Sequence, residues 1–222
     1  MAADPDCLIS VFAKAPVAGA VKTRLAPLLG AQGAADFHAQ CVARTLAVAT
    51  AAGVGPVELC CAPDARDPFL AACALEHKVG LTEQAAGDLG WRMHSAIGAG
   101  LARHRGVMVI GTDCPALGAR DLCAAAAALD AGADAAIAPA EDGGYVLIAA
   151  RRSDPGLFAG VAWGTDRVMS QTRANLGALG WNWRELATQW DIDRPEDYQR
   201  LLRMLPEWLD APCGTQTQRR AS

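Results

Sequence analysis

Short apolar runs alternate with longer alanine-rich segments along almost the whole chain of 222 residues. The segments expected to form strands are 8–12, 57–62, 78–81, 107–110, 135–139, 145–149 and 181–186. The segments expected to form helices are 31–52, 68–76, 88–104, 119–131, 165–179 and 195–205. Strands and helices that alternate in this way pack as a mostly parallel sheet with helices on both faces. The sequence therefore predicts an α/β fold.

The length of the chain suits a single α/β domain, and neither a linker nor an internal repeat divides it. We expect one domain over residues 1–222, with a core at 7–205 and a polar C-terminal tail. The net charge of −4 argues against a nucleic-acid partner. Because no apolar run could span a bilayer and the N-terminus has no basic signal-peptide region, we expect a cytoplasmic protein without a membrane partner.

The cysteines and histidines form no motif that carries chemistry. The chain has eight cysteines but no C-x-x-C pair, and most of them lie in apolar surroundings. In a cytoplasmic protein such residues are expected to be reduced core thiols rather than zinc ligands. The four histidines form no cluster and no G-x-S-x-G sequence occurs, so covalent hydrolase chemistry has little support.

A cationic segment directly follows the first expected strand. Residues 13–24 contain Lys14, Lys22 and Arg24 but no carboxylate, and Gly19 helps to shape a loop whose backbone N–H groups can face an anion. The segment is not a P-loop, because G-x-x-x-x-G-K-[ST] is absent. Its place after the first strand of an α/β sheet favours a phosphate site, and the alternative is a solvated surface loop.

Asp113 follows the clearest buried strand, 107–110. Ligands of such sheets bind beyond the carboxyl ends of the strands. Mg²⁺ prefers one or two carboxylates together with waters and substrate phosphates, so Asp113 is a candidate metal ligand. The alternative is a turn former or a cap for the helix 119–131.

The segment PAEDGGY, residues 139–145, combines Glu141 and Asp142 with Gly143 and Gly144. Two glycines let a backbone pass close to a ligand. Asp-Gly is also a strong hairpin signal, and on these residues alone a plain turn is favoured.

Two further segments have open interpretations. Asp191 and Asp193 precede a helix that Pro195 can open, and Asp193 is either its cap or a second metal ligand. Arg92 lies in the first turn of the helix 88–104, where a cation opposes the helix dipole. This position indicates an anionic ligand or simply a surface location.

Six segments occur in a fixed order: FAKAPVAGAVKTRL, QAAGDLGWRM, GTDCPAL, APAEDGGYVLI, WGTDRVMSQT and WDIDRPEDY. Together they resemble the bacterial GT-A-like transferases called domain of unknown function 2064, also named radical-SAM/selenodomain-associated transferase 1. The resemblance extends over about residues 7–205. More distantly, the chain is similar to the molybdenum-cofactor and 2-phospholactate guanylyltransferases. The resemblance implies a three-layer α/β/α, Rossmann-like fold of the nucleotide-diphospho-sugar transferase (GT-A) type, with a mostly parallel mixed sheet.

The resemblance also implies a set of site residues. The implied nucleotide-binding residues are Ala13, Lys14, Gly19, Lys22, Thr23, Arg24, Gly90, Arg92, Ser95 and Thr112. The implied acceptor- or sugar-binding residues are Glu141, Asp142, Gly143, Gly144 and Trp163. The implied metal is Mg²⁺, with Mn²⁺ as an alternative, on Asp113 and on Asp193 or Asp191. The expected catalytic residues are Lys22, Arg24 and Asp113.

The sequence departs from the pattern of related proteins at two places, and the second departure narrows the expected reaction. The first loop lacks the G-x-G of typical nucleotidyltransferases, and the Asp-x-Asp of many glycosyltransferases is reduced to Asp113 alone. A metal site split between two segments favours nucleotidyl transfer. We therefore expect a Mg²⁺-dependent enzyme that moves a nucleoside monophosphate from a nucleoside triphosphate to a small phosphorylated acceptor. The alternatives are a glycosyltransferase that uses a nucleotide-sugar donor, and a nucleotide-binding protein without turnover.

Overall fold

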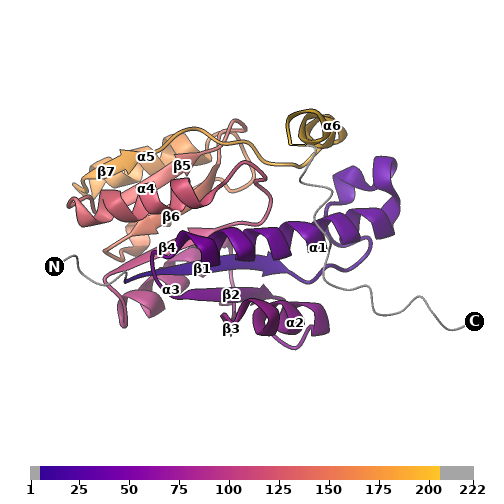
Figure 1. Cartoon of the computed structure of the whole chain (residues 1–222). Coiled ribbons are helices and arrows are strands. Elements are labelled where there is room, and N and C mark those ends of the chain that lie inside the picture. The colour runs from indigo at the N-terminus through magenta and orange to yellow at the C-terminus, as the bar shows by residue number, and fades with distance from the viewer. Residues whose placement is uncertain (1–5, 206–222) are drawn as a thin grey trace, which may run out of the picture.

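The computed structural model describes residues 6–205, which contain one seven-stranded sheet in the order β3-β2-β1-β4-β6-β5-β7. The strands are β1 (Cys7–Lys14), β2 (Val57–Ala62), β3 (Gly80–Glu83), β4 (Gly106–Ile110), β5 (Ala135–Pro139), β6 (Tyr145–Ala150) and β7 (Trp183–Glu185). The α-helices are α1 (Ala26–Ala52), α2 (Pro68–His77), α3 (Leu89–Leu101), α4 (Ala119–Asp130), α5 (Val168–Ala178) and α6 (Pro195–Met204). Two 3₁₀ turns, η1 (Thr23–Leu25) and η2 (Pro155–Phe158), complete the set. Every expected strand and helix is present, and the predicted α/β fold is confirmed (Figure 1).

The sheet is mixed but mostly parallel. β1 pairs in parallel with β2 and β4, β2 with β3, and β5 with β7. β6 lies between β4 and β5 and runs antiparallel to both. The carboxyl ends of β1, β4 and β5 therefore meet at one edge of the sheet, and the turn after β5 lies at this edge as well.

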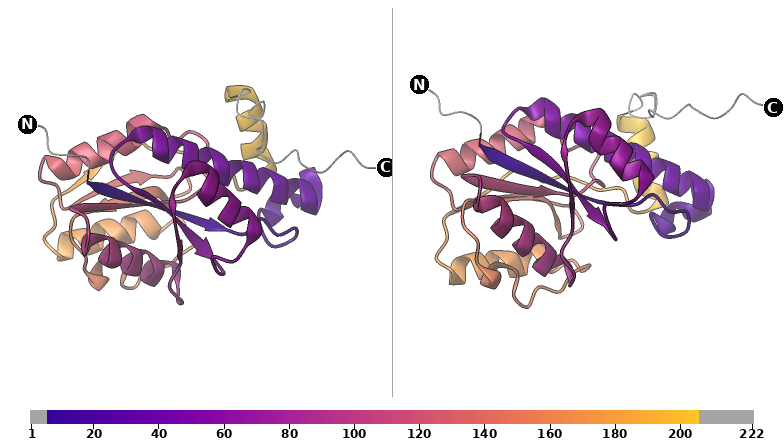
Figure 2. Two further views of the ribbon diagram at one scale, coloured as in Figure 1. Left: turned by 60° about the horizontal axis from the view of Figure 1, so that its bottom comes forward. Right: turned by 90° about the horizontal axis from the view of Figure 1, so that it is seen from below.

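Helices cover both faces of the sheet, as Figure 2 shows. Helices α1, α2 and α4 pack on one face, where Leu46, Leu70 and Leu122 share a core with alternate residues of the strands. Helices α3 and α5 pack on the other face through residues such as Ile97 and Leu176. Helix α6 packs apart from the sheet, against η1 and the first half of α1.

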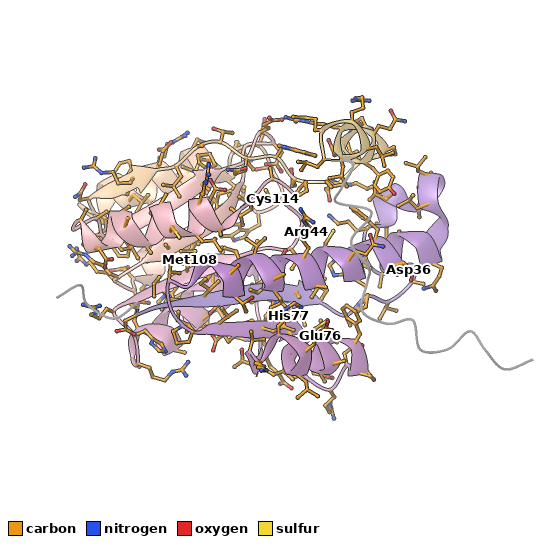
Figure 3. The ribbon with its side chains drawn as sticks, viewed as in Figure 1. Asp36, Arg44, Glu76, His77, Met108 and Cys114 are labelled. Atoms are coloured by element: carbon orange, nitrogen blue, oxygen red, sulfur yellow. The ribbon has the colours of Figure 1, made fainter. Side chains whose placement is uncertain are left out.

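Helix α1 breaks at Gly30, whose φ of 72° is not helical, so its regular part covers the predicted segment 31–52. The helical spacing of its apolar residues turns one side toward the sheet, while Asp36 points outward. Figure 3 shows the same contrast elsewhere: Met108 and Cys114 lie inside the molecule, and Glu76 lies at its surface.

The seven cysteines within residues 6–205 form no disulfide with one another, and Cys123 is the exposed one among them. Burial raises the pKa of the Cys60 thiol to about 12 and that of the Cys114 thiol to about 11. These thiols stay protonated at neutral pH, as expected for core residues. Cys213 lies outside the described residues. In the part of the chain that the structure describes, no helix is both long and apolar enough to cross a bilayer.

Candidate active site

The ammonium group of Lys22 lies 2.8 Å from Oδ1 of Asp113 at the carboxyl edge of the sheet. Only 3% of the Lys22 side chain is exposed, and its ammonium also donates to the backbone carbonyl of Ile192. The cationic loop and the end of β4 are thus in direct contact. The expected meeting of these two segments at one edge is present in the structure.

Asp113 retains capacity to bind a cation. Its side chain is 48% exposed, although its Oδ1 is buried. The contact with Lys22 satisfies the distance of an ion pair but not the direction of a hydrogen bond, so Oδ1 keeps an unfilled acceptor position. Asp113 is not a helix cap, because α4 begins after Gly118 and the Asp121 carboxylate accepts the Gly118 N–H.

Opposing effects act on the pKa of Lys22. Burial alone would lower it, but the negative charges of Asp113 and Asp193 outweigh burial and raise the pKa above its usual value. Lys22 is therefore a permanent cation within a group of acids. Its backbone adopts the left-handed conformation, with φ 46°.

Arg24 reaches the second acidic segment. Its guanidinium lies 2.6 Å from Oδ2 of Asp193, and both side chains are substantially exposed. Of the two interpretations of Asp193, the structure excludes the helix cap. The residue before α6 is Arg194, and the Asp197 carboxylate accepts the N–H groups of both Asp193 and Arg194.

Asp191 lies among other carboxylates. Burial is the main cause that raises its pKa to about 6, and the charges of Asp142 and then Asp193 raise it further. Asp142 and Asp191 therefore belong to one electrostatic group, although the first follows β5 and the second precedes α6.

The carboxylates at this edge suit a metal site in which the substrate and water supply most of the ligands. Within residues 6–205, no three His, Cys, Asp or Glu side chains are placed to hold a metal ion together. Mg²⁺ accepts one or two carboxylates when phosphates and waters supply its other ligands. The half-exposed carboxylate of Asp113, with Asp193 or Asp191 nearby, meets this smaller requirement.

His38, which the sequence analysis did not single out, supports the cationic loop. Its Nε2 lies 3.0 Å from the backbone carbonyl of Lys14, and because a carbonyl only accepts, Nε2 carries the proton. Burial lowers the pKa of His38 and favours the neutral ring. A polar residue between Phe37 and Cys41 on the buried side of a predicted helix is the signal that could have found it.

Arg92 is held beside the end of β1. It donates from Nε to the Gly87 carbonyl (2.9 Å) and from a terminal nitrogen to Oε1 of Gln84 (3.5 Å). Gln84 in turn donates to the carbonyls of Cys60 (2.9 Å) and Ala13 (3.4 Å). This chain of bonds connects the start of α3 to the carboxyl end of β1.

The other expected nucleotide residues are spread along this edge. Lys14 at the end of β1, Gly19 in the following loop and Thr23 at the start of η1 are exposed. Thr112 is buried beside Asp113. Ser95 lies further along α3.

The segment PAEDGGY forms the turn between β5 and β6, so the hairpin interpretation is correct for its backbone. Gly143 has φ 88°, and a Cβ there would lie 2.2 Å from the Asp166 carbonyl oxygen, so the turn needs glycine. Glu141 is held by Arg200, which donates to its two carboxylate oxygens at 2.6 and 3.0 Å. Arg200 also stacks on the Trp190 ring at 4.4 Å, which joins the turn to α6.

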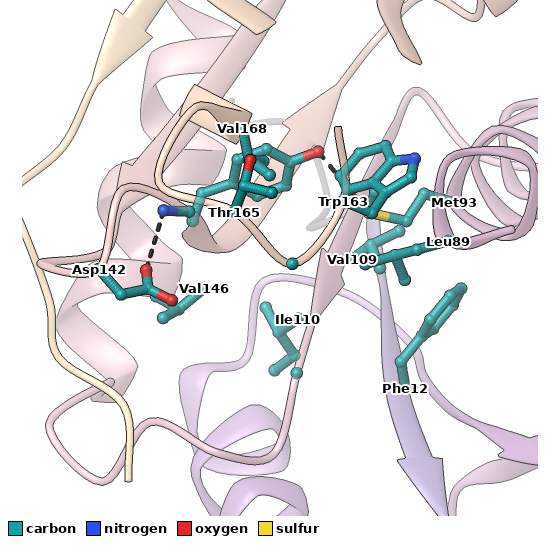
Figure 4. A pocket seen from close by; sticks show the side chains of 14 residues that line it. Phe12, Leu89, Met93, Val109, Ile110, Asp142, Val146, Trp163, Thr165 and Val168 are labelled. Atoms are coloured by element: carbon teal, nitrogen blue, oxygen red, sulfur yellow. Dashed lines mark hydrogen bonds between the residues drawn. The ribbon is translucent and has the colours of Figure 1, made fainter. Parts of the chain in front are cut away.

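A cavity of about 200 Å³, hereafter the apolar pocket, opens beside this turn (Figure 4). Its lining residues are Phe12, Leu89, Met93, Val109, Ile110, Gly111, Asp142, Gly144, Tyr145, Val146, Trp163, Gly164, Thr165 and Val168. Gly90 lies behind its wall, since a Cβ on Gly90 would come within 2.8 Å of the Trp163 ring. The structure therefore brings Asp142, Gly144 and Trp163 together around one pocket, and Gly90 lies against Trp163.

The sheet order and the acid at the end of β4 define the class of fold. The structure is similar to that of a protein from Desulfovibrio desulfuricans G20 with a proposed nucleotide-diphospho-sugar transferase activity, at 29% identity and a TM-score of 0.81. That alignment covers 89% of this chain and 86% of the other. The fold is therefore of the nucleotide-diphospho-sugar transferase (GT-A) type. Residues 45–165 match the family described as "Uncharacterized protein conserved in bacteria (DUF2064)", and the chain belongs to this family.

More distant structures share the fold alone. The 4-diphosphocytidyl-2C-methyl-D-erythritol synthase of Anaerococcus prevotii has 12% identity and a TM-score of 0.60, over 91% of this chain and 97% of that chain. The glucosyl-3-phosphoglycerate synthase of Mycobacterium tuberculosis, solved with Mn²⁺ and UDP, has 11% identity and a TM-score of 0.52, over 95% and 80%. No curated protein sequence is significantly similar to the chain.

Proposed function

We propose that the chain is a Mg²⁺-dependent nucleotidyltransferase that moves a nucleoside monophosphate from a nucleoside triphosphate to a small phosphorylated acceptor. The contact between Lys22 and Asp113 carries the proposal, because it joins a cationic loop to a half-exposed carboxylate at the ligand-binding edge of the sheet. A bound polyphosphate needs cations and N–H donors on one side and a metal ligand on the other. Both are present within a few ångströms.

The residues divide the work between them. Lys14, Lys22 and Arg24 would bind the phosphates and offset the negative charge that develops on the departing pyrophosphate. Asp113, with Asp193 or Asp191, would hold the metal. Bound Mg²⁺ would supply charge neutralisation and orientation of the phosphates. The attacking oxygen of a phosphorylated acceptor is already ionised at neutral pH, so the protein needs no general base for this step.

Glycosyl transfer from a nucleotide-sugar is the second candidate. It is favoured by the 29% identity to a protein whose proposed activity is nucleotide-diphospho-sugar transfer. In that reaction the same cationic loop would bind the departing nucleoside diphosphate. A third candidate, a nucleotide-binding protein without turnover, requires the same loop but no metal-dependent product.

Product analysis separates the three candidates. The purified full chain is incubated with Mg²⁺, a panel of small phosphate esters, and either each nucleoside triphosphate or each common nucleotide-sugar. Metal-dependent release of pyrophosphate from a triphosphate is the expected result. Release of nucleoside diphosphate from a nucleotide-sugar would select glycosyl transfer, and nucleotide binding without either product would select the non-catalytic candidate.

A further inference from the structure

The apolar pocket differs in chemistry from the cationic loop beside it. Among the lining residues that the structure describes, none is Lys, Arg or His, and Asp142 is the one carboxylate. Phosphate groups are bound by cations and by backbone N–H donors. The pocket therefore suits a part of a ligand that carries no phosphate.

The size and walls of the pocket indicate a single apolar ring. A dry cavity of about 150 Å³ lined by apolar side chains binds benzene, and the present pocket has a volume of about 200 Å³. Phe12, Met93 and Trp163 supply flat or flexible apolar surface. A nucleobase would place several donors and acceptors against these apolar side chains, which is unfavourable.

Asp142 supplies a charged, directional contact. Its Oδ1 accepts the N–H of Gly144 at 2.8 Å, which fixes the carboxylate. Figure 4 shows Asp142 on the opposite side of the pocket from Leu89 and Met93. The other carboxylate oxygen is available to accept a hydrogen bond, and its negative charge disfavours an anion.

We propose that the apolar pocket holds the body of the acceptor, a ring-sized apolar group with one hydroxyl directed to Asp142. The acceptor's phosphate lies outside the pocket, on the side of Lys22 and Asp113. The assignment of this ligand as the acceptor rests on the proposed function, whereas its chemistry rests on the lining of the pocket.

Three six-membered-ring probes test the ligand chemistry without turnover: cyclohexanol, myo-inositol and cyclohexanecarboxylate. Their affinities for the full chain are measured by ligand-observed saturation-transfer NMR. Myo-inositol should bind at least about tenfold more weakly than cyclohexanol, because its hydroxyls would be buried without partners. Cyclohexanecarboxylate should bind about threefold to tenfold more weakly, because its charge faces Asp142. Equal binding of myo-inositol and cyclohexanol would overturn the proposal.

Substitutions in the pocket wall test whether the probes bind in the apolar pocket. Leu89→Asp adds a charge to a wall residue that is 43% exposed, and should weaken cyclohexanol binding about tenfold. Leu75→Asp is the matched control on an exposed helix position outside the lining, and should leave binding unchanged. Asp142→Asn should remove the discrimination against cyclohexanecarboxylate.

A second wall variant provides an independent test in case Leu89→Asp does not fold. Gly111→Leu adds a side chain where a Cβ meets nothing within 4 Å, and should also weaken cyclohexanol binding. Cyclohexanol binding that survives both wall variants, in folded protein, would overturn the proposal. If the enzyme releases pyrophosphate and neither wall variant changes the KM for the acceptor, the pocket does not hold the acceptor. That result would overturn the pocket proposal but leave the proposed function standing. Probe binding as predicted, with no product from any nucleotide, would instead overturn the proposed function.

Discussion

The backbone N–H of Ile192 donates to the carbonyl oxygen of Asp113 at 2.9 Å, and so joins the segment before α6 to the end of β4. The Ile192 side chain is completely buried in a cluster with Leu25 and Leu201. This anchor holds Asp191 and Asp193 next to the cationic loop. The acidic side of the candidate site therefore depends on an apolar side chain that is completely buried.

Truncation of this anchor should destabilise the protein. Ile192→Ala removes buried methyl groups and should lower the free energy of unfolding by about 2–4 kcal/mol, whereas Ile192→Val should cost about 0.5–1.5 kcal/mol. Urea denaturation measures both. Leu202→Ala, at a position of α6 that is 42% exposed, is the control and should cost less. Equal effects of Ile192→Ala and Leu202→Ala would contradict the role given to Ile192.

Replacement of Lys22 by a neutral residue should increase the repulsion between the carboxylates of Asp113 and Asp193. Lys22→Met keeps most of the buried volume but removes the cation beside Asp113 and Asp193, and should destabilise the protein by about 1–3 kcal/mol. Because Mg²⁺ can then neutralise the unpaired carboxylates, added Mg²⁺ should raise the melting temperature of Lys22→Met more than that of the unsubstituted protein. Thermal unfolding with and without Mg²⁺ measures the difference.

Lys14→Met is the matched control, since Lys14 is an exposed lysine of the same loop. It should change stability little and should not increase the response to Mg²⁺. A Mg²⁺ response of Lys22→Met no larger than that of the unsubstituted chain would mean that the cation does not bind at these acids.

Local patterns were sufficient to predict the elements and one part of the site. Alternating apolar runs predicted the strands, and Asp113 follows a run that is buried throughout in the structure. Because β1 and β4 are parallel neighbours, their carboxyl ends meet, and the contact of Lys22 with Asp113 follows from that arrangement.

Contacts between distant segments could not be predicted in the same way. Asp193 resembled a helix cap because it stands near Pro195, but in the structure it pairs with Arg24. The pairing of Glu141 with Arg200 depends on how α6 packs, which no local pattern records. The apolar pocket likewise depends on the insertion of β6 between β4 and β5, since a hairpin sequence does not specify its outer neighbour.

A separate pH dependence of stability should arise at Asp134, at the opposite edge of the sheet. Burial alone would raise its pKa, but the N–H of Asn182 and the guanidinium groups of Arg151 and Arg152 outweigh burial and lower it. A lowered folded-state pKa stabilises the native state above the unfolded-state pKa, and this stabilisation is lost as the pH falls through the folded-state value.

Asp134→Asn should therefore reduce stability by about 1–3 kcal/mol at pH 7 and by clearly less near pH 3. Urea denaturation at both pH values checks the difference. Asp130→Asn, at the end of α4, is the control and should show no such dependence. An Asp134→Asn penalty that is equally large at acidic pH would show that the ion pairs do not cause it.

The most direct test of the account is the rate of Mg²⁺-dependent pyrophosphate release by Asp113→Asn, compared with Asp130→Asn and with the unsubstituted chain. The substitution keeps the shape of the side chain but removes the charge that would hold the metal. We predict that Asp113→Asn remains folded and loses at least about a hundredfold in rate, while Asp130→Asn retains full activity. An Asp113→Asn variant that turns over at the unsubstituted rate would contradict the assignment of the site.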